Sequence, residues 1–230
     1  QGEKLIGSTF GTSGGNPRSV IIPERIDYQT HQIDGGLRYG GEQLQLALEY
    51  FGSAFVDEEL SQIWDNPYTV SGIAAVEGQR SQPPDNWFNQ IIASGGYDLP
   101  WWNTRVAANA AFGWMTQNDS FLPFSVNSTL AAPIPVPRSS LDGRIDTRLI
   151  NFQVDSHPLE RLRLDLRYRY DERDNQTPRN TYVYIPNDSA IQGTIGGSQA
   201  RVNPPYSYRQ NHVDFVTGYA LFHRTALTPR

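Results

Sequence analysis

The stretch at 161–171, RLRLDLRYRYD, alternates apolar and charged side chains without a break. Its even-numbered positions carry Leu or Tyr, and its odd-numbered positions carry Arg or Asp. A period of two places these sets on opposite faces of a β-strand. Strands of soluble proteins average about five or six residues, whereas a strand that crosses a bilayer within a barrel needs about 9–11. The stretch therefore predicts a membrane-spanning barrel strand.

Other segments repeat this alternation, and their connections alternate in length. Further strands are predicted at 28–39, 43–55, 87–97, 104–116, 144–156 and 208–221, with another beginning near 225. Short turns are predicted at 40–42, 98–103, 157–160 and 222–224, and long loops at 56–86, 117–143 and 172–207. The turn centres Gly41, Leu99, Pro158 and His223 lie 58, 59 and 65 residues apart, so one unit of two strands recurs about every 60 residues.

Long loops at one end and short turns at the other predict the architecture. The expected fold is all-β, an antiparallel up-and-down transmembrane β-barrel section with short periplasmic turns and long extracellular loops. Residues 1–230 would form a single section of about seven strands plus the start of an eighth, within a larger barrel. The segment 13–25 is expected to be loop, so the chain would begin inside a loop and would not close on itself. A soluble sandwich has no reason to place every long loop at one end.

Composition excludes several classes of protein. The apolar stretches fall short of the roughly 20 residues that a transmembrane helix needs. A net charge of -5 argues against nucleic-acid binding. The sequence contains no nucleotide-binding or hydrolase motif, so we expect no enzyme. With 0 Cys it has no C-x-x-C-H haem attachment and no thiolate metal site.

Several segments together resemble one family. They are 28–50 (YQTHQIDGGLRYGGEQLQLALEY), 62–68 (QIWDNPY), 94–100 (SGGYDLP), 115–123 (MTQNDSFLP), 137–147 (PRSSLDGRIDT) and 168–178 (YRYDERDNQTP). Over about residues 8–225 the chain is similar to the MtrB/PioB family of decahaem-associated outer-membrane barrels, whose members are much longer. The SLDG and YRYDERDN segments are the most specific.

The resemblance implies a function in the bacterial outer membrane. Barrels of this family sheathe a periplasmic multihaem (decahaem) c-type cytochrome, so that electrons pass between periplasm and cell exterior. The expected partners are that cytochrome in the lumen, membrane lipid and, in some systems, an extracellular multihaem cytochrome. Haem c is expected on the partner, with no cofactor in this chain. A diffusion porin or substrate channel, and a soluble β-rich binding or adhesion protein, are the alternatives.

Charged residues of the polar strand faces are the candidates for lining the lumen and contacting the cytochrome. They are Asp34, Arg38, Glu49, Arg105, Arg163, Asp165, Arg167, Arg169 and Asp171. Two interpretations stay open: a solvated lumen wall with cross-strand ion pairs, or a surface that docks haem propionates through Arg forks.

Two acidic groups in the predicted loops have oxygen ligands that suit Ca²⁺. One comprises Asp57, Glu58, Glu59 and Asp65, and the other comprises Asp171, Glu172, Asp174 and Asn175. Asp57, Glu59, Asp65 and Asp174 are the weak calcium candidates, since neither group matches an EF-hand loop, and a solvated acidic loop is the alternative.

Overall fold

The computed structural model describes residues 2–13, 16–67, 76–123, 126–127, 136–184, 199–222 and 225–227. Its strands are β1 (Gly2–Ser13), β2 (Asn16–Ile26), β3 (Tyr28–Gly40), β4 (Leu44–Asp57), β5 (Ser61–Asp65), β6 (Glu77–Ser81), β7 (Asn86–Leu99), β8 (Thr104–Gln117), β9 (Gly143–Leu159), β10 (Leu162–Asn175), β11 (Thr181–Tyr184), β12 (Gln199–Val202), β13 (Tyr208–Phe222) and β14 (Thr225–Leu227). Within these ranges no helix is long and apolar enough to span a membrane.

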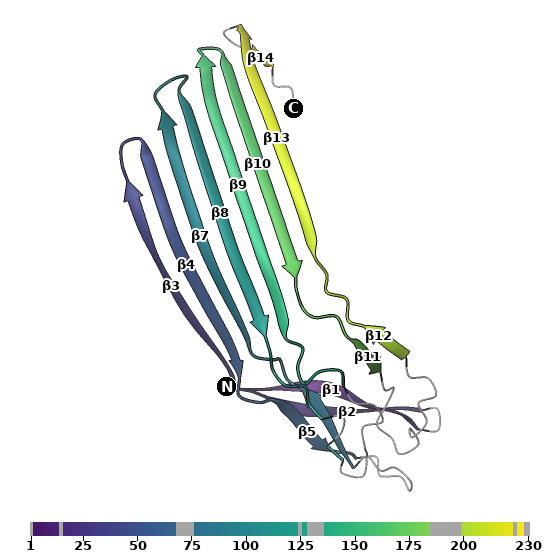
Figure 1. The fold of residues 1–230 in the computed structure, drawn as a ribbon. Helices are drawn as coiled ribbons and strands as arrows, with labels where there is room; N and C mark the ends of the chain where they lie inside the picture. The colour runs from purple at the N-terminus through teal and green to yellow at the C-terminus, as the bar shows by residue number, and fades with distance from the viewer. Residues whose placement is uncertain are drawn as a thin grey trace.

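Eight of these strands form one antiparallel sheet in the order β14-β13-β10-β9-β8-β7-β4-β3. The sheet is a single curved layer, with short turns at one end and long connections at the other (Figure 1). β3 and β14 form its two edges and do not pair, so the sheet is open. The expected antiparallel strands and the open sheet are both confirmed.

The turn positions agree with the sequence prediction except at one hairpin. The predicted turn at 157–160 is displaced, because β9 continues to Leu159 and only residues 160–161 separate it from β10. Residues 223–224 of the predicted turn at 222–224 lie outside the described residues.

The long-loop end contains hairpins that the sequence did not predict. The prediction of loop at 13–25 is wrong, because β1 and β2 pair along most of their length. Smaller hairpins, β5–β6 and β11–β12, lie within the predicted loops 56–86 and 172–207. Breaker residues such as Pro17 and Pro23 suggested loop, yet a two-stranded hairpin leaves edge positions where Pro loses no ladder hydrogen bond.

Among the described residues, no second layer covers either face of the main sheet (Figure 1). A compact monomer of this mass exposes about 10,500 Å², whereas this chain exposes 15849 Å². Among the described residues, the only buried hydrophobic ones are Ile22 and Ala111. The main sheet therefore has no hydrophobic core of its own, and its apolar side chains require an apolar environment outside the chain.

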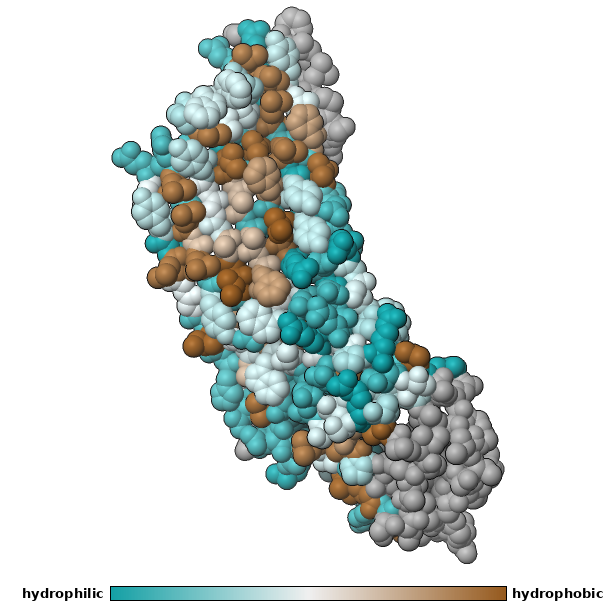
Figure 2. Space-filling view, in the orientation of Figure 1, coloured by the Kyte–Doolittle hydropathy of each residue, from teal (hydrophilic) through white to brown (hydrophobic). Residues whose placement is uncertain are grey.

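Strand register separates the main sheet into an apolar face and a polar face. The apolar face carries Leu162, Leu164 and Leu166 of β10 with their cross-strand neighbours, such as Val154 and Phe215 beside Leu166. Rows of cross-strand partners connect β4 with β10 through β7, β8 and β9. These rows show that Leu44, Leu46 and Leu48 of β4 lie on the same face as the leucines of β10. Figure 2 shows apolar side chains gathered over the half of the sheet nearer the short turns, and hydrophilic ones over the other half.

Candidate functional site

All nine candidate residues from the sequence lie on the polar face. Arg38 and Arg169 belong to one row of cross-strand partners, and Glu49 and Asp171 belong to the next row. The other candidates occupy neighbouring rows of this face: Asp34, Arg105, Arg163, Asp165 and Arg167. The register thus places on one face side chains that are up to 137 positions apart, from Asp34 to Asp171.

Most of these charges are paired with a neighbour. Arg38 Nη2 lies 2.7 Å from Glu49 Oε1, and Arg169 Nη2 lies 2.9 Å from Asp171 Oδ2. Arg163 Nε lies 2.9 Å from Asp165 Oδ2. Two further pairs, Arg105 with Asp98 and His212 with Asp214, add to a mixed-sign surface. Because the arginines stay about half or more exposed, each pair contributes little stability and leaves donors facing outward.

Arg167 differs from the other candidate arginines. Within the described part of the chain, it makes no hydrogen bond or ion pair, and its side chain is exposed. It borders a hollow of about 430 Å³ whose lining includes Asn109, Gln153 and His212. Further hollows on the polar face border Arg38, where glycines and short Ala side chains leave space. This face can therefore accept protruding groups and offer them Arg, Asn and Gln donors.

The four calcium candidates do not form one group, although the backbone N–H of Glu59 donates to Asp57 Oδ1 at 3.0 Å. Among the described residues, no group of three or more His, Asp or Glu side chains could hold a metal ion. Glu59 pairs with Arg25 at 3.0 Å, and Asp65 lies separately in β5. β10 continues to Asn175, so Asp171 and Asp174 point to opposite faces of a strand. The prediction of an acidic loop from residue 172 onwards was wrong at residues 172–175, because these residues belong to strand β10.

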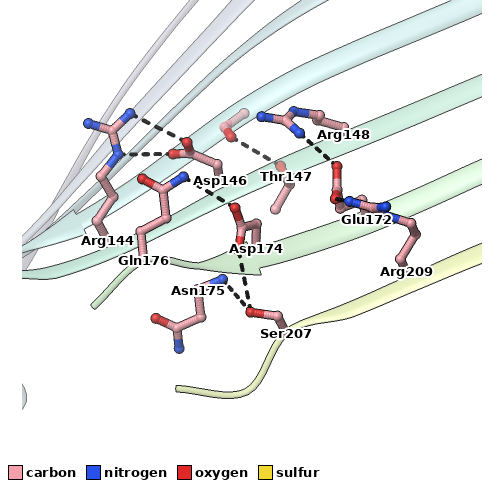
Figure 3. Close-up of polar contacts among 11 residues, drawn as sticks. Arg144, Asp146, Thr147, Arg148, Glu172, Asp174, Asn175, Gln176, Ser207 and Arg209 are labelled. Carbon is pink, nitrogen blue, oxygen red and sulfur yellow. Dashed lines mark hydrogen bonds and ion pairs between the residues drawn. The ribbon is translucent and has the colours of Figure 1, made fainter. Parts of the chain in front are cut away.

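A charged cluster on the apolar-face side was missed by the sequence analysis (Figure 3). Arg148, Glu172 and Arg209 are direct cross-strand partners on β9, β10 and β13. Glu172 Oε2 accepts from Arg148 Nη1 at 2.8 Å, and Glu172 Oε1 accepts from Arg209 Nη2 at 2.6 Å. Asp146 lies in the next row towards the long loops and accepts from Nε of Arg144, one row further, at 3.1 Å. We call Arg144, Asp146, Arg148, Glu172 and Arg209 the outer-rim cluster.

The outer-rim cluster marks the end of the apolar surface. Its row continues into Phe112, Ile91 and Tyr50 on the neighbouring strands, and the next row towards the short turns holds Ile150 and Tyr170. One signal in the sequence could have revealed this cluster: the two-residue alternation of β9 and β10 continues beyond their apolar residues and places Arg148 and Glu172 on the apolar-face side. Sequence alone does not reveal which residues of separate strands become partners.

Polar groups within the apolar surface are paired with one another. Thr104 Oγ1 and Ser156 Oγ lie 2.7 Å apart, and Tyr168 donates to Asn211 Oδ1 at 2.8 Å. Tyr50 makes the same kind of bond to Asn89 at 2.7 Å. Polar groups removed from water need such partners, so these pairs suit a surface placed in an apolar medium.

A buried carboxylate joins two hairpins at the long-loop end. Glu24 of β2 is 1% exposed, and its Oε2 lies 3.0 Å from Lys4 Nζ. Arg80 of β6 lies 3.9 Å from Glu24 Oε1, and Gln62 of β5 donates to the carbonyl of Pro23. Burial alone raises the pKa of Glu24, but Lys4, Arg80 and Gln82 together hold this pKa below its ordinary value.

Acidification should therefore release this junction. A carboxyl whose folded pKa is depressed stabilises the fold at every pH above its unfolded value of about 4.3, and that contribution is lost as pH falls through the folded pKa. We expect the amides of β1 and β2 to exchange faster with solvent deuterium at pH 3 than the intrinsic pH dependence predicts. In a Glu24→Gln variant, the protection of these amides should be low at pH 7 and should change little on acidification. Equal protection in wild type and variant at pH 7 would contradict this account.

Two comparisons identify proteins to which the chain is similar. Residues 1–229 match the family described as "Putative outer membrane beta-barrel porin, MtrB/PioB". The chain is 28% identical over 220 residues to the protein named "Outer membrane protein MtrB" from Shewanella baltica. The aligned residues make up 95% of the chain and 30% of that relative. The chain thus spans about 30% of the length of this curated relative. The family is one of porin-like outer-membrane proteins. The open sheet of the chain and its two chemically distinct faces agree with this family match. The chain belongs to the MtrB/PioB family of outer-membrane β-barrel proteins.

Proposed function

We propose that this chain forms part of a barrel wall that encloses a multihaem c-type cytochrome and insulates it from lipid, so that electrons cross the outer membrane through the partner. The apolar face contacts lipid and the polar face lines the lumen. Further strands pair with the edge strands β3 and β14 and complete the barrel. The short turns face the periplasm, as in other outer-membrane barrels.

One observation carries the proposal: a wide, open polar face that offers hydrogen-bond donors over several strands. The rows of cross-strand partners from β3 to β13 place four arginines on this polar face: Arg38, Arg105, Arg167 and Arg169. The three that form ion pairs, Arg38, Arg105 and Arg169, keep about half or more of their side chains exposed. Arg forks bind carboxylates in two-point geometry, as haem propionates would require. With 0 Cys in the chain, covalently attached haem would have to reside on the partner.

The size of the barrel supports the same interpretation. A closed eight-stranded barrel has an interior just wide enough for its own side chains. The main sheet does not close with eight strands, so it fits a wider barrel. Such a barrel either encloses a protein or holds a water-filled channel. The word porin in the family description implies the second of these for its members.

Purification in mild detergent from the native envelope separates these functions. The proposal expects a separate haem-staining polypeptide that stays with the barrel through ion exchange and gel filtration. It also expects electron transfer across sealed vesicles that contain the pair, with little solute flux. A barrel that purifies without haem and conducts small solutes would be a diffusion porin, and the proposal would be rejected.

A further inference from the structure

The outer-rim cluster presents cations to its surroundings and hides its acids. The Glu172 side chain is 6% exposed, whereas those of Arg148 and Arg209 are 47% and 66% exposed. Asp146 is likewise 7% exposed beneath Arg144, which is 53% exposed. The carboxylates therefore hold the guanidinium groups in place, and the accessible surface is cationic although the local charges nearly balance.

The arginines of this cluster keep unused donors. Arg148 uses only Nη1 for Glu172, so its Nε and Nη2 have no hydrogen-bond partner among the described residues. Arg209 uses Nε and Nη2 for Glu172 and also interacts with the Tyr170 side chain. A guanidinium has five N–H donors in a fixed fork, which matches the oxygens of a phosphate. Because Glu172 of β10 fixes one fork on each of the two flanking strands, β9 and β13, little side-chain entropy is lost when an anion binds.

The position of the cluster selects the kind of anion. It lies on the lipid-facing side, one row beyond Ile150 and Tyr170, where the apolar surface ends towards the long loops. A lipid that covers Ile150 with its acyl chains would place its headgroup at Arg148 and Arg209. In outer-membrane barrels the long loops face the cell exterior, so this lipid belongs to the outer leaflet.

We propose that Arg148 and Arg209, held by Glu172, bind the phosphate of a phosphorylated lipid headgroup in the outer leaflet, with Arg144 as an additional cation. The site is separate from the polar face, because adjacent strand positions point to opposite sides. It rests on the membrane placement of the chain and not on the cytochrome.

Lipid retention by the full protein tests this site. The purified protein is reconstituted in phosphatidylcholine vesicles that contain either bis-phosphorylated lipid A or its dephosphorylated form, then extracted, and the bound lipid is counted by mass spectrometry. The wild type should retain the phosphorylated form at least fivefold better. Arg148→Gln/Glu172→Gln/Arg209→Gln should lose this preference, and removal of all three charges leaves no unpaired buried carboxylate to disrupt folding.

Two further samples make the test decisive. Arg163→Gln, on the polar face, should keep the wild-type preference, and Arg209→Gln alone should lower it at least twofold. An unchanged preference in the triple variant would overturn the proposal, as would displacement of lipid A by millimolar inorganic phosphate, which would indicate a free-anion site. Retention of the haem partner by the triple variant would show that the two functions are separate.

Discussion

Ala93→Arg should lower the free energy of unfolding from lipid vesicles by about 2–4 kcal/mol, the cost of an Arg on the lipid face near the bilayer midplane. Ala93 lies at the middle of β7 on the apolar face, between Leu48 and Ala110. No acid among the described residues of its row can neutralise the new charge. Urea titration of the reconstituted protein, followed by tryptophan fluorescence, measures this difference.

Ser94→Arg is the matched control. Ser94 is the next residue of β7 and lies on the polar face between Ala47 and Asn109. There the new guanidinium stays in a polar environment, and the change in unfolding free energy should remain within about 0.5 kcal/mol, as for most surface substitutions. A larger cost at 94 than at 93 would mean that the faces are assigned the wrong way round.

Arg167→Glu should reduce retention of the haem-bearing partner at least tenfold, which corresponds to about 1.4 kcal/mol. Arg167 has no ion pair or hydrogen bond among the described residues, so its reversal breaks neither within the sheet and removes only the attraction between Arg167 and Asp165. The new carboxylate would repel an anionic propionate and would add to the charge of Asp214, which borders the same hollow. Immunoprecipitation with quantitative haem staining gives the retained fraction.

Arg161→Glu makes the same charge change outside the proposed lumen. Arg161 lies exposed in the turn between β9 and β10, six positions from Arg167. Partner retention should match the wild type within twofold. If both variants lose the partner equally, total charge and not the polar face governs binding.

The alternation of side chains was enough to predict the main sheet. In 161–171 every second residue is Leu or Tyr, and the strand and its two faces were predicted correctly. Long alternation in neighbouring strands leaves few registers that keep all apolar residues on one side, so the face of each candidate charge could be predicted as well.

The sequence could not predict what depends on contacts between distant positions. Glu24 becomes buried because β5–β6 supplies Arg80 and Gln62, which no local pattern around 13–25 encodes. Likewise, Glu172 acquires Arg148 and Arg209 only through the register of three strands. Glu172 was therefore considered only as part of a loop acidic group, although β10 turns it away from Asp171.

The central claim is that the polar face lines a lumen occupied by a haem protein, and adjacent photo-crosslinking positions test it most directly. Ala107 lies on the polar face beside Gln153, and Ala108 lies on the apolar face beside Phe152. p-Benzoylphenylalanine is placed at either position of the full protein in native membranes, irradiated, and the products are stained for haem. The account predicts a haem-staining adduct from position 107 and none from position 108. A haem adduct from 108, or no protein adduct from 107, would contradict it.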